Sequence, residues 1–401
     1  MKMELIADEK ILFRSPEPES IFCFTPALLI GENRRIIAAS DLGGPGTAAL
    51  EGPRSRLGDY PAGNQVRFFL SDDEGETWRE SETRLAMRHE ILFRAGKILY
   101  ALGNAPELVI SRSCDNGEHW SEPAVLRGDA KRPWHQSSTT PVCRNGRVYL
   151  VYEQYNPSGV SWPNVRQFLM SAPEDADLCD AGNWRFSQPF DADPLCARFR
   201  ELCDLGADWF PGILETHVLP IAPSCGHLYT PGENSFLLCS RFNTPGFQLG
   251  ALLKGIEHPD GSLEITLFPG RMKEFPLFVV PFPGGAIKFH PVFDEKSQFY
   301  FLVANQPRAV FEGEFTGPVS NRRKLVLWCS RDAVSWQNLG TIAFGPAENA
   351  ARSYPHMAIC GDDLLIVARS GDEKAKNEHD NNLVTLHRVR QFRALAAEAG
   401  I

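Results

Sequence analysis

The sequence predicts an all-β fold that is built from an array of small antiparallel sheets. A turn with the spacing Ser-x-Asp-x-Gly-x-x-Trp occurs at residues 71–78 and recurs in the same register at 113–120, and a degraded copy lies at 330–336. Each copy follows a β-rich hydrophobic run, and the first two are about 40 residues apart, which is typical of repeated small sheets rather than of one large sheet. The 30 Pro and 33 Gly residues fit many short strands joined by turns.

The residues of the repeated turn explain how it closes a hairpin. Side-chain oxygens of Ser71 and Asp73 can accept hydrogen bonds from the loop amides, Gly75 can take a positive φ, and Trp78 starts the next strand with its ring in an apolar layer. The motif resembles the Asp-box (bacterial neuraminidase) repeat, and the chain resembles the sialidase-type β-propeller superfamily. This resemblance implies a six-bladed β-propeller with four antiparallel strands per blade. The box itself stabilises turns, so it is evidence for architecture rather than for activity.

The chain divides into six expected blades, which together form a single domain of residues 1–401. A short strand within 4–14 and the terminal strand 382–389 are expected to share the last sheet, because a ring closed by both ends of the chain leaves no exposed edge. A Gly- and Pro-rich insertion at 41–63 is too polar for the core. The expected blades cover residues 21–78, 85–126, 134–184, 209–268, 286–336 and 357–389.

Charge and cysteine patterns exclude several classes of partner and cofactor. The net charge is −9, with 50 acidic and 41 basic residues and no lysine-rich block, so neither nucleic acid nor an anionic membrane is an expected partner. The first ten residues carry acids where a secretory signal needs an apolar core, which predicts a cytoplasmic protein. The 10 Cys residues form no C-x-x-C pair and no Cys/His zinc pattern, so we expect free thiols, no metal and no cofactor.

Ionisable and aromatic side chains stand where five of the six expected inner strands begin. In a propeller the innermost strand of each blade lines the central channel, so these residues are expected to converge on one carbohydrate-binding site. The alternatives are that the strand starts are merely solvated and that the tryptophan is buried. The expected substrate-binding residues from these entrances are Arg88, Glu90, Trp134, His135, Gln136, Lys288, Arg352 and His356.

The resemblance to sialidases extends to individual residues. Those enzymes clamp the substrate carboxylate with three arginines, use a tyrosine nucleophile that a glutamate activates, and hold an aspartate acid/base on a blade-one loop. The matching segments imply Tyr354 as the nucleophile, Glu215 as its base and Asp59 as the acid, with Asp41 in reserve. They also imply Arg241 and Arg322 as two of the three arginines.

The first arginine of the sialidase pattern is missing, because Phe24 stands in its place within residues 23–28. A phenyl ring cannot replace the bidentate recognition of a carboxylate by a guanidinium group. Other basic groups, Arg88, Lys288 and Arg352, are available at neighbouring entrances. The sequence therefore predicts an exo-glycosidase that acts on a terminal sugar, acidic or non-sialic.

The tyrosine mechanism is chemically consistent with these residues. A phenol with an ordinary pKa near 10 becomes a nucleophile at neutral pH if Glu215 takes its proton. Glu215 with Glu90 or Asp59 could instead act as an ordinary pair of glycosidase carboxylates. Two further alternatives are a non-catalytic carbohydrate-binding propeller, and a lyase or epimerase that uses Tyr354 or a histidine as base.

Overall fold

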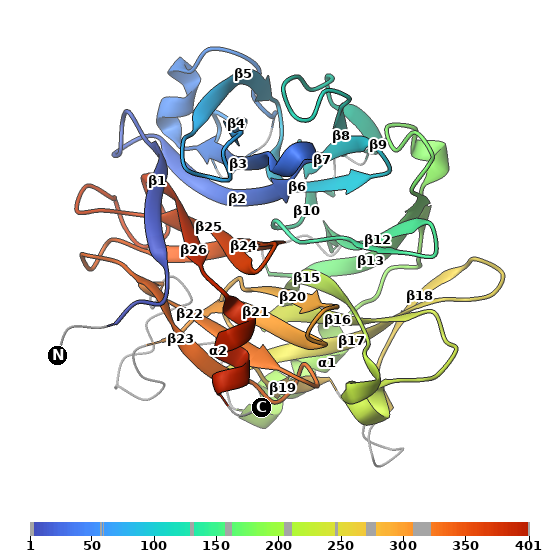
Figure 1. Cartoon of the computed structure of the whole chain (residues 1–401). Helices are drawn as coiled ribbons and strands as arrows, with labels where there is room; N and C mark the ends of the chain where they lie inside the picture. The colour runs from blue at the N-terminus through green and yellow to red at the C-terminus, as the bar shows by residue number, and fades with distance from the viewer. Residues whose placement is uncertain are drawn as a thin grey trace.

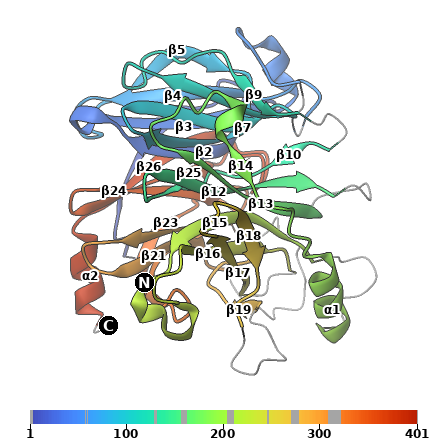
Figure 2. The same ribbon diagram turned by 90° about the vertical axis from the view of Figure 1, so that its right-hand side faces the viewer.

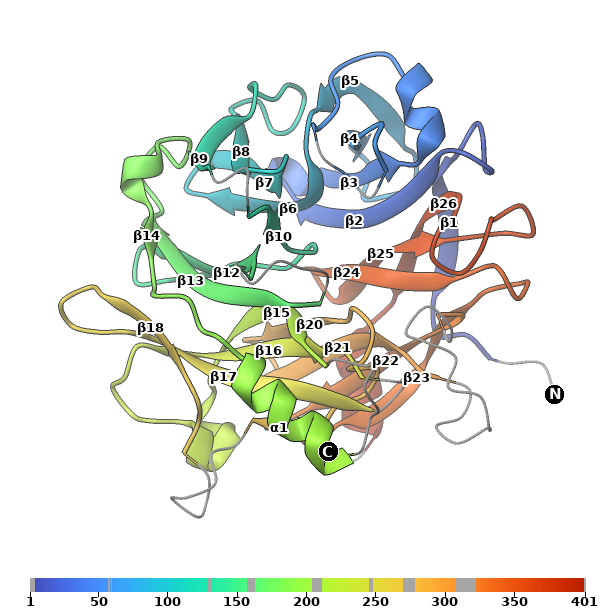
Figure 3. The same ribbon diagram turned by 180° about the vertical axis from the view of Figure 1, so that it is seen from behind.

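The strands form six antiparallel sheets that are arranged as blades around a ring, which confirms the predicted six-bladed β-propeller (Figure 1). The computed structural model describes residues 4–56, 58, 60–128, 132–156, 163–203, 211–244, 248–269, 278–307 and 322–399. Each blade contains a path of four hydrogen-bonded strands, and blades three and four each carry one further short strand. Figure 3 shows the same ring from the opposite side.

The strand bounds follow the chain order. Blade one contains β2 (Phe22–Ile30), β3 (Ile36–Gly43), β4 (Gln65–Ser71) and β5 (Arg79–Leu85), and blade two contains β6 (Arg88–Ala95), β7 (Ile98–Asn104), β8 (Leu108–Ser113) and β9 (Ala124–Arg127). Blade three contains β10 (Trp134–His135), β11 (Val142–Arg144), β12 (Arg147–Tyr155), β13 (Val165–Pro173) and β14 (Arg185–Phe186). Blade four contains β15 (Ile213–Pro220), β16 (Ser235–Phe242), β17 (Leu249–Glu257), β18 (Leu263–Thr266) and β19 (Val279–Pro281). Blade five contains β20 (His290–Asp294), β21 (Phe299–Asn305), β22 (Lys324–Ser330) and β23 (Gln337–Phe344), and blade six contains β24 (Arg352–Cys360), β25 (Asp363–Ser370), β26 (Leu383–Val389) and β1 (Asp8–Arg14).

The two ends of the chain close the ring in blade six. Strand β1 pairs antiparallel with β26, from Asp8 opposite Arg388 to Arg14 opposite Leu383. This pairing confirms the expected closure and covers the edge of β26 that would otherwise be free.

The hydrophobic core consists of layers between neighbouring blades. Successive residues of β16 show why: Phe236 and Leu238 pack toward blade three, whereas Leu237 and Cys239 pack toward blade five. This alternation follows from the period of two along a strand, and it gives each sheet two buried faces. Each blade is therefore held by the blades on both sides of it.

The repeated turns form as predicted and lie far from the ends of the inner strands that carry the candidate site. Gly75, at φ 90°, donates its N–H to the Ser71 hydroxyl at 2.7 Å, and that hydroxyl donates to Asp73 at 2.8 Å. The second copy repeats these bonds between Gly117, Ser113 and Asp115. Both turns follow the last residue of the third strand of their blades.

The structure contains helices where only strands and loops were expected. Helix α1 (Asp193–Cys203) follows blade three (Figure 2). Its Phe199 packs edge-on against Phe242 of blade four, with the ring centroids 4.7 Å apart. Helix α2 (Phe392–Glu398) follows the last strand, and the short 3-10 turns are η1 (Glu32–Arg34), η2 (Pro45–Ala49), η3 (Ala181–Asn183) and η4 (Pro223–Leu228). None of the described helices is long and apolar enough to cross a membrane. All ten cysteines carry free thiols.

Candidate active site

Four inner strands share one irregularity at the same end of their blades. In each of them the pairing with the second strand skips two residues, which is the pattern of a β-bulge, and bulges re-aim side chains. The left-handed φ angles of His89, Glu215 and Tyr354, at 55°, 56° and 49°, are uncommon for residues other than glycine and often mark functional sites. The skipped pairs are Phe24–Thr25, His89–Glu90, Glu215–Thr216 and Tyr354–Pro355.

Three of the predicted residues meet in one hydrogen-bonded cluster. Nη1 of Arg241 donates to a carboxylate oxygen of Glu215 at 3.0 Å and to the hydroxyl oxygen of Tyr354 at 3.3 Å. Arg241 and Glu215 are almost fully buried, while Tyr354 keeps 8% of its surface exposed. Burial on its own would raise the pKa of Glu215, but the charges of Arg241 and His135, with hydrogen bonds from Arg241 and Tyr354, lower that pKa below its ordinary value. The cluster thus holds an ionised carboxylate beside a phenol.

Two further guanidinium groups lie over the ring of Tyr354. Cζ of Arg369 is 3.9 Å from the ring centroid, and Cζ of Arg322 is 5.4 Å from it. Burial lowers the pKa of Arg322 to about 10, and the nearby charges of Arg369 and Arg241 act in the same direction. A second carboxylate, that of Glu378, accepts a hydrogen bond from the backbone N–H of Arg322 at 3.2 Å. Cations therefore outnumber carboxylates among the described residues around Tyr354.

Arg369 was not among the residues expected from the sequence, although its register carries a signal. It pairs with Ser353, directly before the bulge of blade six, just as Arg241 pairs with Leu214 directly before the bulge of blade four. Both arginines are the last residue but one of a hydrophobic second strand. Each also donates from Nε to a backbone carbonyl of the next blade, Arg241 to Ala286 at 3.0 Å and Arg369 to Phe24 at 2.6 Å. Aligning the second strands of blades four and six would have found it.

The side chain of Arg369 lies over Phe24, the residue that stands where the sialidase pattern has an arginine. Its Cζ lies 5.1 Å from the centroid of the Phe24 ring, and its Nη1 donates to the carbonyl of His379 at 3.2 Å. Phe24 is fully buried beneath it. A guanidinium group from blade six thus lies beside Phe24 of blade one.

Two expected binding residues of blade three prove to be structural. Trp134 is fully buried in the core between blades two and three, with its ring 5.3 Å from that of Phe168, so it is not a stacking surface for a sugar. The side-chain amide of Gln136 is also buried, and it donates to the carbonyl of Val151 at 2.8 Å. These positions correct the expectation, and the reason is that the strand alternation turns Trp134 into a core layer.

Arg352 also makes structural contacts rather than contacts in the tyrosine cluster. Its guanidinium group donates from Nε and Nη2 to the carboxylate of Glu9 at 2.7 and 2.9 Å, and from Nη1 to the carbonyl of Gly371 at 2.7 Å. Glu9 lies on β1, so this ion pair ties the first strand of the chain to blade six. Arg352 therefore stabilises the ring closure and does not join the cluster at Tyr354.

His356 belongs to a histidine cluster that fills the centre of the ring. Its ring centroid is 4.2 Å from that of His290, which is in turn 4.9 Å from that of His217. Thr140 bridges His290 and His356 through its hydroxyl, at 3.2 and 3.5 Å. Burial lowers the pKa of His356 to about 3, and the charge of Lys288 contributes. The histidines pack together near the centre of the ring, and substrate binding by His356 stays a prediction.

Lys288 lies between this histidine cluster and the tyrosine site. Its ammonium group donates to the carbonyl of Pro355, which directly follows Tyr354. Burial lowers the pKa of Lys288 to about 7, although the carboxylate of Glu215 opposes this shift. The Lys288 side chain therefore connects the histidine cluster to the segment that carries Tyr354.

The acidic groups of blades one and two lie on another side of the ring. Asp41 accepts hydrogen bonds from the backbone of Thr25 and from Asn64, both at 2.7 Å, so its carboxylate is held in place. Burial raises the pKa of the neighbouring Glu90 well above its ordinary value, and the charge of Asp41 adds to this effect. Burial raises the pKa of the core residue Tyr152, and the nearby charges of Arg88 and Glu90 lower and raise that pKa respectively. Asp59, the expected acid, lies outside the described residues.

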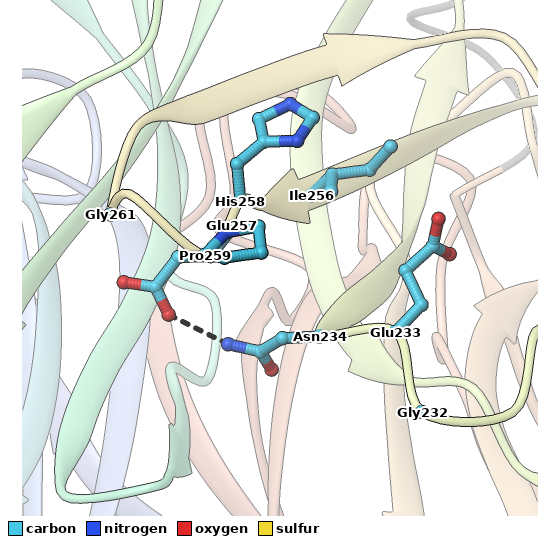
Figure 4. A pocket seen from close by; sticks show the side chains of 8 residues that line it. All are labelled: Gly232, Glu233, Asn234, Ile256, Glu257, His258, Pro259 and Gly261. Carbon is cyan, nitrogen blue, oxygen red and sulfur yellow. Dashed lines mark hydrogen bonds between the residues drawn. The ribbon is translucent and has the colours of Figure 1, made fainter.

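No group of three or more potential metal-ligating side chains occurs in the described part of the chain. A surface hollow of about 530 Å³ does lie on blade four, where the start of β16 meets the turn after β17 (Figure 4). Its carboxylates are already paired: Glu233 with Lys254, and Glu257 with Asn234 at 2.7 Å. Arg241 stands near the other end of β16, so this hollow is remote from the tyrosine cluster.

Solved structures resemble this chain over nearly its whole length, whereas no protein-family model and no curated protein matches it. A sialidase from Trypanosoma rangeli, in complex with sialic acid, is 14% identical with a TM-score of 0.57, and the alignment covers 99% of this chain and 60% of that chain. An α-L-arabinanase from Penicillium chrysogenum, complexed with arabinobiose, is 11% identical with a TM-score of 0.55, covering 96% and 99% of the two chains. An α-L-arabinofuranosidase from Fusarium graminearum is 12% identical with a TM-score of 0.54, covering 97% and 99%.

These similarities confirm, for the fold, the expected likeness to sialidase-type propellers. The chain spans 60% of the length of the trypanosomal sialidase and nearly the full length of the two arabinose-specific proteins. At 11–14% identity the likeness concerns architecture, so the chemistry has to be argued from the side chains of this chain.

Proposed function

We propose that this protein is an exo-acting glycosidase for a terminal, acidic sugar, with Tyr354 as nucleophile and Glu215 as its base. The observation that carries the proposal is the sharing of Arg241 Nη1 between the Glu215 carboxylate and the Tyr354 hydroxyl, at 3.0 and 3.3 Å. Two of these residues sit at bulge positions with left-handed φ angles, which favours a functional role over a packing role. The glycosidase names of the solved neighbours support the same class of reaction.

The proposed reaction uses the phenol in its neutral form until the moment of attack. The Tyr354 oxygen bonds to the anomeric carbon, the phenol proton passes to Glu215, and the glycosidic bond breaks. Arg241 stabilises the negative charge that builds up on the phenol oxygen, because it already bonds that oxygen. A neutral phenol also approaches an anionic sugar without charge repulsion. Asp59 stays the predicted donor of the proton that the leaving group needs.

The charges around Tyr354 favour an anionic substrate. Arg241, Arg322 and Arg369 all contact the hydroxyl or the ring face of Tyr354. Guanidinium groups bind carboxylates through pairs of parallel hydrogen bonds, and in a site with little water such pairs are strong. We therefore assign the sugar carboxylate to the space beside Arg322 and Arg369, with Arg369 in the role that Phe24 cannot fill.

A panel of 4-methylumbelliferyl glycosides tests the proposal. It comprises glycosides of N-acetylneuraminic acid, glucuronic acid, galacturonic acid and L-arabinofuranose, assayed by release of the fluorescent phenol. At least one acidic sugar should be turned over, and Tyr354→Phe should reduce kcat by at least about 100-fold with little change in binding. Arg369→Gln should mainly raise KM for that acidic sugar, by roughly tenfold or more, because a charge-assisted contact is lost.

Arg352→Gln is the matched control for Arg369→Gln. Both residues are buried arginines of β24 and β25, but Arg352 is paired with Glu9 away from the cluster. The control should lower the melting temperature without a selective rise in KM. Full activity of Tyr354→Phe would show that the nucleophile is another group. Binding of an acidic sugar without any turnover would identify the protein as a carbohydrate-binding propeller.

A further inference from the structure

A buried pair of a carboxylate and an imidazole lies beside the tyrosine cluster and takes no part in the reaction described above. Nδ1 of His135, on β10, lies 3.1 Å from a carboxylate oxygen of Glu153, on the neighbouring strand β12. A carboxylate only accepts hydrogen bonds, so Nδ1 carries the hydrogen and donates it. Nε2 of His135 is then the ring atom that can exchange a proton with a ligand.

The position of Glu153 is fixed by the strand that carries Glu215. Its second carboxylate oxygen accepts hydrogen bonds from the backbone N–H and the hydroxyl of Thr216, at 3.0 and 3.1 Å. Thr216 is the residue directly after Glu215 in the bulge of blade four. Glu153 is fully buried, and these donors hold its carboxylate in place. The fixed carboxylate in turn restricts the orientation of the His135 ring. This arrangement orients His135 in the way that a third group orients a catalytic base.

His135 faces the candidate site rather than the core. Its partner in the strand, Trp134, packs into the core, so the alternation along β10 turns His135 to the other side. The nearby charge of His135 helps to lower the pKa of Glu215. Its ring also meets the ring of His89, the bulge residue of blade two, edge-to-face at 5.6 Å. No residue in the described part of the chain forms a hydrogen bond with Nε2 of His135.

We infer that His135, oriented by Glu153, is the proton donor and acceptor for the leaving group, with the ring of His89 beside it. The inference rests on the proposed function, and it moves the acid role from Asp59 to His135. Blade three lies opposite blade six in the ring order, so the imidazole and Tyr354 approach a bound sugar from different sides. Opposite faces are what a displacement at the anomeric carbon requires of its nucleophile and its acid.

The proton balance of the two steps is complete. In the first step the imidazolium gives its Nε2 proton to the glycosidic oxygen as the bond to the anomeric carbon breaks, while Tyr354 bonds to that carbon and its proton moves to Glu215. In the second step the neutral imidazole takes a proton from water, and the hydroxide attacks the anomeric carbon. The bond to Tyr354 then breaks, and the phenol oxygen recovers its proton from Glu215. The net reaction consumes one water and releases the sugar and an alcohol.

Leaving-group dependence tests the inference, because only a poor leaving group needs the acid. The 4-methylumbelliferyl and methyl glycosides of the turned-over sugar are compared for the unaltered protein, His135→Gln, Glu153→Gln and Asp59→Asn. We expect His135→Gln to lower kcat/KM by about 100-fold or more on the methyl glycoside and by less than about tenfold on the aryl glycoside. Glu153→Gln, a positioning change, should show the same split with a smaller loss.

His258→Gln is the control, since His258 lies at the exposed turn of blade four and pairs with Glu264. It should leave both rates unchanged. Equal losses of His135→Gln on the two glycosides would overturn the inference, as would the expected split appearing in Asp59→Asn instead. Either result leaves the tyrosine mechanism standing, whereas absence of turnover by the unaltered protein on every glycoside would refute the proposed function itself.

Discussion

Lowering the pH from 7 to 5 should destabilise the protein through the histidine cluster at the centre of the ring, and His356 allows the effect to be calculated. In the folded chain burial and the charge of Lys288 lower the pKa of His356 to about 3. In the unfolded chain its pKa is near 6.5. Between these two pKa values the unfolded state therefore binds a proton at His356 that the folded state does not bind. Stability from this residue is fully present above about pH 6.5 and is lost as the pH falls toward about 3.

The size of the loss follows from the two pKa values. At pH 5 nearly all unfolded molecules carry the proton, whereas about one folded molecule in a hundred does. Relative to pH 7, the free energy of unfolding should fall by about 2 kcal/mol from His356 alone. His290 and His217 have their pKa values lowered by burial as well, so they act in the same direction.

Urea unfolding of the unaltered protein and of His356→Gln, at pH 7 and pH 5, isolates this contribution. Titrating groups remote from the histidine cluster are common to both proteins and cancel in the difference. The variant should lose about 2 kcal/mol less than the unaltered protein over this interval. His258→Gln, at an exposed turn, should lose as much as the unaltered protein. An equal loss in His356→Gln would mean that His356 already carries a proton in the folded chain, and the reasoning would be wrong.

Two further predictions concern stability. Ser71→Ala should lower the free energy of unfolding by about 1–2 kcal/mol in urea titrations, because the buried N–H of Gly75 loses its acceptor. The kinetics of glycoside turnover should stay unchanged. A selective loss of activity at unchanged stability would contradict the remote position of this turn. Glu90→Gln should make the free energy of unfolding less sensitive to rising pH. The raised pKa of Glu90 stabilises the fold below about pH 4.5, and this contribution is lost as the unfolded chain ionises at higher pH. If the free energy of unfolding changed with pH equally in the variant and the unaltered protein between pH 5 and pH 8, Glu90 would be ionised in the folded chain.

The repeated turns and the hydrophobic runs were sufficient to predict the architecture. Each blade is a local unit whose strands follow one another along the chain, so the pattern of turns directly indicates the sheets. The closure of the ring was also predictable, because an unpaired strand at each end has only the other as a partner. Helix α1 was not predicted, although its sequence carries helical signals: Leu195, Phe199 and Leu202 recur at helical spacing, and Pro194 lies in the first turn, where proline is favoured.

The candidate site was predictable only where a residue stands at a bulge or matches a family pattern. Glu215, Arg241, Arg322 and Tyr354 come together as expected. A local sequence does not show which neighbours a side chain meets across the ring, and this is why Arg352 was expected in the site although Glu9 binds it. Arg369 was missed although its place in the second strand matches that of Arg241, and its neighbours Phe24 and His379 come from other parts of the chain.

The shared bulge also explains how this ring tolerates so much sequence change. Strand residues between the blades need only be apolar and of suitable volume, and many combinations satisfy that requirement. Phe24 and Tyr354 belong to none of the apolar layers between blades. Selection can therefore exchange the group at a bulge, a phenyl ring for a phenol or an imidazole for a carboxylate, without disturbing the packing that holds the blades together. Solved structures that are only 11–14% identical to this chain accordingly retain the same fold.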